Sequence, residues 1–208
     1  MNLTPPDSAV ARAAAALASE ASPPFLLNHL YRTYWYGRAL VRTDLDEEAA
    51  YVAAMLHDLG LTEAFRGDSS FELVTAEHAA RFLEARDWDV ERIGLVERAI
   101  TRHTNITPNE IPVELVVQGG SAFDVIAFPP DSIGDEVIES VETAFPRDGF
   151  KEGMLKLFFA EIEAQPDGVF AKWRSHSASR SWQRAGSIRS SRCRGEGRPN
   201  ASSGRGSD

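Results

Sequence analysis

An imidazole and a carboxylate stand next to each other at His57 and Asp58, within the segment AAMLHDLG. Apolar residues flank the pair, so we expect both side chains to be buried, where each needs a strong partner. A divalent cation is such a partner, because neutral imidazole and carboxylate both suit Zn, Fe or Mn. Taken alone, such a pair is more often a capping aspartate beside a core histidine.

Two more polar residues stand in apolar helical segments. His29 lies in FLLNHLYR, and Asp124 lies in VVQGGSAFDVI. Gly120 and Ser121 precede Asp124 on the same helix face and keep that face free of bulk. Without a metal, His29, Asp124 and the His57–Asp58 pair would each need a separate reason for burying a polar side chain. One shared metal site explains all of them. We therefore predict a shared metal site.

Other side chains are candidates for acting on a substrate. His103 ends an apolar helical stretch, and is either a proton donor or a residue that interacts with its own helix dipole. Arg32 either binds a carboxylate or phosphate, or pairs with an acid such as Glu72. Tyr31 belongs to an aromatic run that we expect to pack the core, with one ring lining the pocket. His78 is expected on the surface.

The elements that position these residues are predicted to be helices. Capping and first-turn residues divide the chain into helical segments, and convincing alternating strand patterns are missing from the sequence. Asp7, Thr75 and Asp89 are placed to cap helices, and Pro112 is placed in a first turn. We predict an all-α fold, with helices over about residues 7–18, 23–41, 46–59, 75–85, 89–103, 112–128, 135–144 and 150–164.

Composition narrows the class of protein. The 208 residues carry a net charge of −9, and seven arginines against two acidic residues fall within 175–208, so the rest of the chain is strongly acidic. An acidic body argues against a nucleic-acid-binding surface. The sequence has neither an apolar run of membrane-spanning length nor a secretion signal. Cys193 is the only cysteine, so an internal disulfide is excluded. We expect a cytoplasmic protein that acts on a small molecule, with the choice between monomer and homo-oligomer left open.

The length and the composition predict one domain followed by a tail. Residues 1–174 are long enough for one substantial core. Residues 175–208 consist mainly of Ser, Arg and Gly, which bury too little to offset the entropy of ordering. We predict a compact helical metal-binding domain over 1–174 and a disordered tail over 175–208.

The order of His, His-Asp and Asp in a helical chain is similar to that of the HD-domain metal-dependent hydrolase superfamily. Within it, the segments NHLYRTYWYGRAL, YVAAMLHDLGLT, FELVTAEHAARFLE, AITRHTNI and VVQGGSAFDVIAF most resemble the cyanamide hydratase-like group. The resemblance covers roughly residues 20–174 and implies an HD-domain helical bundle. It places the metal ligands on His29, His57, Asp58 and Asp124.

The resemblance also implies the metal and the reaction. One divalent transition metal is expected, with zinc favoured and iron or manganese as alternatives. Positions that hold a second metal in some relatives fall near Phe71 and Glu72, so whether Glu72 or His78 supports a second ion is left open. Hydroxide held by the metal would hydrate a nitrile such as cyanamide to a urea, with Asp58 or Asp124 orienting the hydroxide and His103 exchanging protons.

Two other functions stay open at this point. The first is hydrolysis of a small phosphoester, for which Arg32 and Arg102 are the candidate contacts. The second is a metal-stabilised helical binding protein without turnover. Leu30 follows His29 where relatives often have a small residue, and its larger side chain is expected to reshape the pocket next to the metal.

Overall fold

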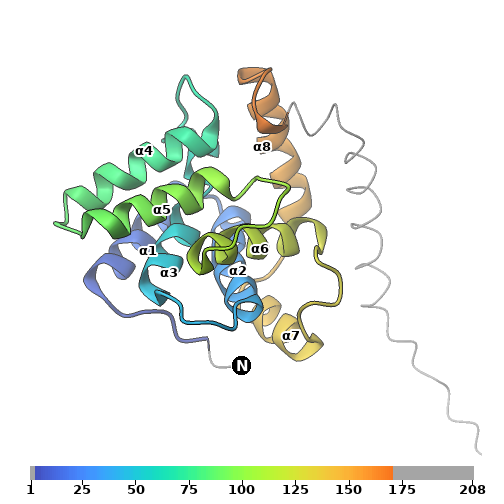
Figure 1. Ribbon diagram of the computed structural model, residues 1–208. Coiled ribbons are helices and arrows are strands. Elements are labelled where there is room, and N and C mark those ends of the chain that lie inside the picture. Colours follow the sequence, from blue (N-terminus) through green and yellow to red (C-terminus); the bar gives the residue numbers. More distant parts are fainter. Residues whose placement is uncertain (1–2, 171–208) are drawn as a thin grey trace, which may run out of the picture.

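The computed structural model describes residues 3–170, which form helices joined by loops (Figure 1). This part of the chain contains no strand, so the predicted all-α class is confirmed. Residues 175–208, predicted to be a disordered tail, lie outside the described residues. The elements are α1 (Ala9–Ala21), α2 (Pro24–Leu40), α3 (Glu47–Leu56), the 3₁₀ turn η1 (Leu59–Leu61), α4 (Phe71–Glu84), α5 (Val90–Arg102), α6 (Pro112–Ile126), α7 (Asp135–Ala144) and α8 (Phe150–Ala164).

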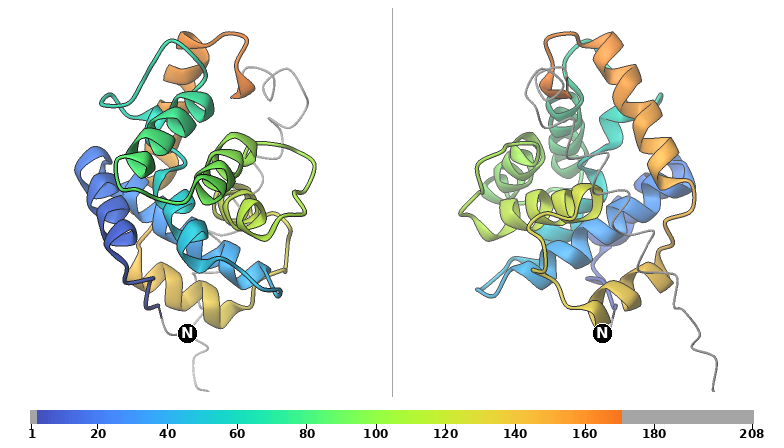
Figure 2. Two further views of the ribbon diagram at one scale, coloured as in Figure 1. Left: turned by 60° about the vertical axis from the view of Figure 1, so that its left-hand side comes forward. Right: turned by 90° about the vertical axis from the view of Figure 1, so that its right-hand side faces the viewer.

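Helix α3 lies at the centre of the bundle. Every residue from Ala49 to Leu56 is buried, and the helix contacts α1, α2, α5 and α6. A helix that is apolar on every face needs neighbours on every side. The antiparallel pair α4 and α5 forms one side of the molecule, and α8 forms another (Figures 1 and 2). Within residues 3–170, no helix combines the length and hydropathy that a bilayer span requires.

Helices α2 and α6 cross with their backbones almost touching, at Gly37 and Gly120. A Cβ atom on Gly37 would lie 2.0 Å from the carbonyl oxygen of Val116, and one on Gly120 would lie 1.9 Å from that of Thr33. Any larger residue would therefore force the helices apart. This close approach brings His29 of α2 next to Asp124 of α6, which the sequence places 95 residues apart.

Several predicted helix boundaries are confirmed because local capping sets them. Asp46 and Asp89 cap α3 and α5, each accepting a 3.0 Å hydrogen bond from the backbone N–H three residues ahead. Helices α7 and α8 have the predicted bounds. The first cap is Ser8 rather than Asp7, whose carboxylate binds Arg12 instead.

The prediction that Thr75 caps the fourth helix is wrong. Helix α4 begins at Phe71, and Thr75 lies inside it, where its hydroxyl donates to the Phe71 carbonyl at 2.7 Å and accepts from the Gly60 N–H at 2.8 Å. The N–H of Phe71 donates to Glu161 of α8 at 3.0 Å. A carboxylate from a distant helix thus satisfies the helix start, which a local pattern does not reveal.

Candidate metal centre

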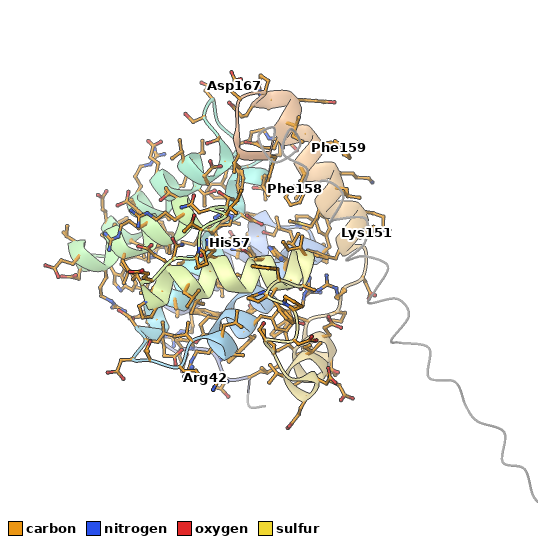
Figure 3. All side chains as sticks on the ribbon, turned by 45° about the vertical axis from the view of Figure 1, so that its right-hand side comes forward. Arg42, His57, Lys151, Phe158, Phe159 and Asp167 are labelled. Carbon is orange, nitrogen blue, oxygen red and sulfur yellow. The ribbon has the colours of Figure 1, made fainter. Side chains whose placement is uncertain are left out.

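The candidate metal centre lies where α3 ends. His57 follows the last residue of α3 and keeps helical angles, with φ −55° and ψ −29°, whereas Asp58 leaves the helix and leads into η1. The two neighbours therefore project from a bend rather than from one helix face. Both are buried, and Figure 3 shows His57 deep inside the bundle.

Three imidazoles surround the carboxylate of Asp58. The Nε2 atoms of His29 and His57 lie 3.3 Å and 3.5 Å from its Oδ2, and Nε2 of His103 lies 3.5 Å from its Oδ1. These separations are long for direct hydrogen bonds. These distances leave a space between nitrogen and oxygen atoms that could bind a metal. The atoms come from α2, from the end of α3 and from the end of α5.

The opposite edge of each imidazole is anchored. Nδ1 of His57 bonds the carbonyl of Ala54 at 2.8 Å, and Nδ1 of His103 bonds the carbonyl of Ile100 at 2.6 Å. A carbonyl accepts only, so each Nδ1 carries the proton and, in a neutral ring, each Nε2 carries a lone pair. Those lone pairs point toward Asp58, which is the arrangement that a cation stabilises.

The pKa values of this group follow from burial and from neighbouring charges. Burial, with His103 and His29 nearby, lowers the pKa of His57 to about 3, so this ring is neutral at pH 7. Burial acts to raise the pKa of Asp58, but the surrounding histidines outweigh it and lower the pKa well below its usual value. A neutral imidazole beside an ionised carboxylate is the protonation state that divalent metals bind.

The residues fit a divalent cation. The ligand atoms of His29, His57 and Asp58 all lie within 4.8 Å of one another. Nε2 of His57 is buried and, among the described residues, has no hydrogen-bond partner. A buried acceptor without a partner is costly, and a bound cation removes that cost. Helices α3 and α5 also direct their negative C-terminal ends toward this space.

Asp124, the fourth predicted ligand, lies behind His29 rather than beside the other three. Its Oδ2 accepts from Nδ1 of His29 at 2.7 Å, and Arg32 donates to both of its oxygens at 2.9 Å and 3.0 Å. Arg147 binds Oδ1 as well. Burial acts to raise the pKa of Asp124, and the arginines lower it far below the usual range. In this arrangement Asp124 orients His29 and holds its proton on Nδ1.

The structure corrects the predicted substrate contacts. Arg32 is completely buried, pairs with Asp124 rather than Glu72, and also donates to the carbonyls of Phe145 and Pro146 at 3.0 Å and 2.9 Å. Tyr31 stacks on Phe145, with ring centroids 4.6 Å apart. These contacts engage both side chains, and neither side chain is among the residues that line the cavity described below.

The other sequence candidates take mainly structural positions. Arg102 pairs with buried Glu114 at 3.2 Å. His78 is half-buried with its ring edge-on to Phe65, and Glu72 accepts a 2.9 Å hydrogen bond from Ser70 at the start of α4. Neither His78 nor Glu72 joins the metal-ligand group formed within residues 3–170.

Phe150 and Arg147, for which the sequence predicts no role, also contact this site. The Phe150 ring stacks on His29 at 5.3 Å, and the guanidinium carbons of Arg32 and Arg147 lie 4.8 Å and 4.6 Å from its centroid. This aromatic ring fixes the plane of the His29 imidazole and covers the guanidinium groups of Arg32, which is buried, and Arg147, which is partly exposed. The sequence signal for these two residues is weak: Arg147 and Phe150 lie three positions apart at the start of α8, and the sequence does not show which residues they contact.

A cavity of about 330 Å³ opens onto the metal centre. His29, Asp58 and His103 form its floor, together with nearby polar residues of the α5–α6 connection and α6. Its walls are apolar and come from α6, the segment after α6, and α8. Asp58 and His103, the predicted catalytic residues, are thus brought together at the floor of one pocket, whereas Arg32 and Tyr31 are not.

Comparison with known proteins agrees with the helical fold. Residues 26–126 match the HD domain family, and this segment contains all four predicted ligands. Residues 26–126 therefore resemble an HD domain, and this supports a metal-dependent protein of the hydrolase or hydratase type, with His29, His57 and Asp58 as the group that could hold a divalent metal. Two cyanamide hydratases of Saccharomyces cerevisiae, DDI2 and DDI3, are each 27% identical to it over 161 residues, which span 69% of this chain and 68% of each yeast protein.

Proposed function

We propose that this protein is a metal-dependent hydratase that adds water to the nitrile carbon of a small neutral molecule. Zinc is the proposed metal, because an imidazole-rich set with one carboxylate suits it well. The similarity to two cyanamide hydratases supports the reaction class. The charge of the residues that line the cavity favours hydration over phosphoester hydrolysis.

Among the described residues, the cavity has neither Lys nor Arg to offer a phosphate. Its lining includes the carboxylate of Asp58. The two arginines that the sequence suggested for phosphate binding are engaged elsewhere, Arg32 with Asp124 and Arg102 with Glu114. Phosphate sites usually surround the anion with Arg, Lys or backbone N–H groups. A neutral electrophile fits this pocket better than a phosphoester.

A divalent cation held by His29, His57 and Asp58 supplies Lewis-acid chemistry, because it acidifies water and polarises an electrophile. Hydration of R–C≡N joins the oxygen of water to the carbon and transfers both hydrogens of that water to the nitrogen after tautomerisation, giving R–C(=O)NH₂. The reaction therefore needs groups that accept a proton from water and return it to nitrogen.

Asp58 and His103 are suited to those proton transfers. Both face the cavity, and Oδ1 of Asp58 lies 3.5 Å from Nε2 of His103. Asp58 orients the incoming water through a carboxylate oxygen, and Nε2 of His103 carries the proton to the substrate nitrogen. The Nδ1 bond to the Ile100 carbonyl holds this ring in place during the exchange.

The test is a paired assay on full-length protein reconstituted with zinc, iron or manganese. Urea formation from cyanamide supports the proposal. Phosphate release from a nucleoside monophosphate or p-nitrophenyl phosphate, without urea formation, would establish the phosphohydrolase alternative instead. Stoichiometric metal with neither product would favour a metal-stabilised binding protein.

A further inference from the structure

The cavity changes character with distance from the metal centre. His29, Asp58 and His103 provide a polar floor, whereas Val125, Met154 and Phe158 are among the apolar residues of its walls. The walls continue outward to exposed apolar residues, since Ile106 is 81% exposed and Phe128 is 54% exposed. A single polar end with a long apolar approach is typical of sites for amphipathic small molecules.

The cavity is also too large for the smallest nitriles. Its volume of about 330 Å³ is the share of roughly ten water molecules in the liquid. Cyanamide consists of one amino nitrogen, one carbon and one nitrile nitrogen, so it would fill only the floor. Small polar molecules gain little from apolar walls, and most of this surface would stay in contact with water.

We infer that the substrate carries an apolar body, of roughly six to eight carbon atoms, attached to a small neutral nitrile-type head. This inference rests on the proposed function, and it names the substrate class of the same site. The head lies at the floor beside Asp58 and His103. The apolar body extends between α6 and α8 toward Ile106 and Phe128.

Two neighbouring phenylalanines on α8 provide a test that distinguishes substrate binding by the cavity from general packing of the helix. Phe158 lines the cavity, and its ring lies 4.2 Å from that of Phe170, another lining residue. Phe159 is 58% exposed and lies outside the cavity. Figure 3 shows Phe158 on the side of α8 that faces the bundle and Phe159 on the outer side.

The main experiment keeps the head constant and lengthens the body. The metal-reconstituted full-length protein is assayed with cyanamide and with N-methyl-, N-propyl-, N-hexyl- and N-benzylcyanamide, measuring formation of the corresponding urea. Each buried methylene is expected to raise kcat/KM about four-fold until the cavity is filled. A flat series, or a decline from cyanamide, overturns the inference and leaves the hydratase function intact.

A binding measurement makes the inference independent of turnover. Calorimetric titration with N-alkylureas should give dissociation constants that fall with chain length, by about four-fold per methylene. If no cyanamide is hydrated, the proposed function fails, but the binding series still decides whether the cavity takes an apolar body. Ureas that bind with equal strength at every chain length would overturn the inference.

Matched variants locate the effect. Phe158→Ala should lower the ratio of kcat/KM for N-hexylcyanamide to that for cyanamide about ten-fold, while Phe159→Ala leaves this ratio unchanged. Ala122→Leu, which fills the cavity rather than emptying it, should shorten the longest accepted chain. Equal effects of Phe158→Ala and Phe159→Ala on the chain-length series would refute the assignment. Ala122→Leu guards against the case in which Phe158→Ala fails to fold.

Discussion

His57 and His103 occupy the same position on two different helices. Each follows the last helical residue, of α3 and of α5, and each bonds its Nδ1 to the carbonyl three residues earlier. Their rings meet edge to face, with centroids 4.9 Å apart. A carbonyl left free at a helix end thus fixes each ring, and both Nε2 atoms are directed at Asp58. The C-terminal ends of α3 and α5, which carry the partial negative charge of the helix dipole, both point toward the space that a cation would fill.

The different surroundings of Asp58 and His103 predict different mutant behaviour. Asp58→Ala should abolish activity and most metal binding, because it removes the anionic member of the ligand group. His103→Ala should keep metal while lowering the rate about 10²- to 10⁴-fold, because His103 lies outside that group and faces the cavity. Metal stoichiometry and turnover are measured on both variants.

The control for that comparison is Asp58→Asn, which keeps the size of the side chain and removes its charge. It should bind metal more weakly than the wild type. The opposite pattern, in which Asp58→Ala retains full metal and His103→Ala loses it, would show that ligand and proton carrier have been assigned the wrong way round.

Asp124→Asn should weaken both the fold and the metal site. The substitution leaves the completely buried Arg32 without its counter-charge, a loss of about 3–5 kcal/mol in the free energy of unfolding. It also weakens the bond that orients His29, so metal affinity should fall about 10- to 100-fold. Denaturant unfolding gives the stability, and competition with a chelator gives the affinity.

Arg147→Gln is the matched control for Asp124→Asn. Its side chain is 26% exposed and has Glu142 as a second acidic neighbour, so the loss should be smaller, about 1–2 kcal/mol. Complete loss of metal from Asp124→Asn, with the fold intact, would instead make Asp124 a direct ligand, as the sequence alone predicts.

Most of the fold could be predicted from the sequence because its signals are local. Proline in first turns and aspartate at caps define helix starts within a few residues of the chain, as at Pro112 and Asp89. The start of α4 could not be predicted this way. Its capping carboxylate, Glu161, is 90 residues away from Phe71, so only the folded chain brings donor and acceptor together.

The site was partly predictable for the same reason. A polar residue in an apolar helix needs a partner, which singled out His29 and Asp124, but the requirement does not say which partner. For Asp124 the structure supplies Arg32 and Arg147 in addition to an imidazole. The cavity could not be predicted, because its walls come from α6, α8 and two connecting segments whose approach is set by packing.

Acid should weaken the contact between the start of α3 and α5. Asp46 accepts from Nε and Nη2 of Arg92 at 2.7 Å and 2.6 Å. Partial burial acts to raise the pKa of Asp46, but these bonds and the N–H of Ala49 outweigh it and lower the pKa. Because the folded-state pKa lies below the unfolded value of about 3.9, the stabilisation is present above that pH and is lost as pH falls through the folded-state pKa.

Asp46→Asn tests this acid dependence. The variant should lose stability at pH 7 and approach the wild type as pH falls below about 4, since protonation removes the same charge from the wild type. Urea unfolding at several pH values measures the difference. Asp7→Asn, in an exposed pair with Arg12, should cost less than about 1 kcal/mol. A constant difference between Asp46→Asn and wild type at every pH would contradict the assignment.

The crossing of α2 and α6 should tolerate no added carbon. Gly120→Ala places a Cβ 1.9 Å from the Thr33 carbonyl oxygen, and backbone atoms cannot turn aside as a flexible side chain would, so we expect a loss of about 3 kcal/mol. Because α2 carries His29 and α6 carries Asp124, metal affinity should fall together with stability. Gly134→Ala is the control, since its added Cβ meets no atom within 4 Å; because Gly134 is the N-cap of α7, the substitution should still cost up to about 1 kcal/mol. Equal unfolding energies and equal metal affinities for the two variants would mean that the glycine contact between α2 and α6 does not set the geometry of the metal centre.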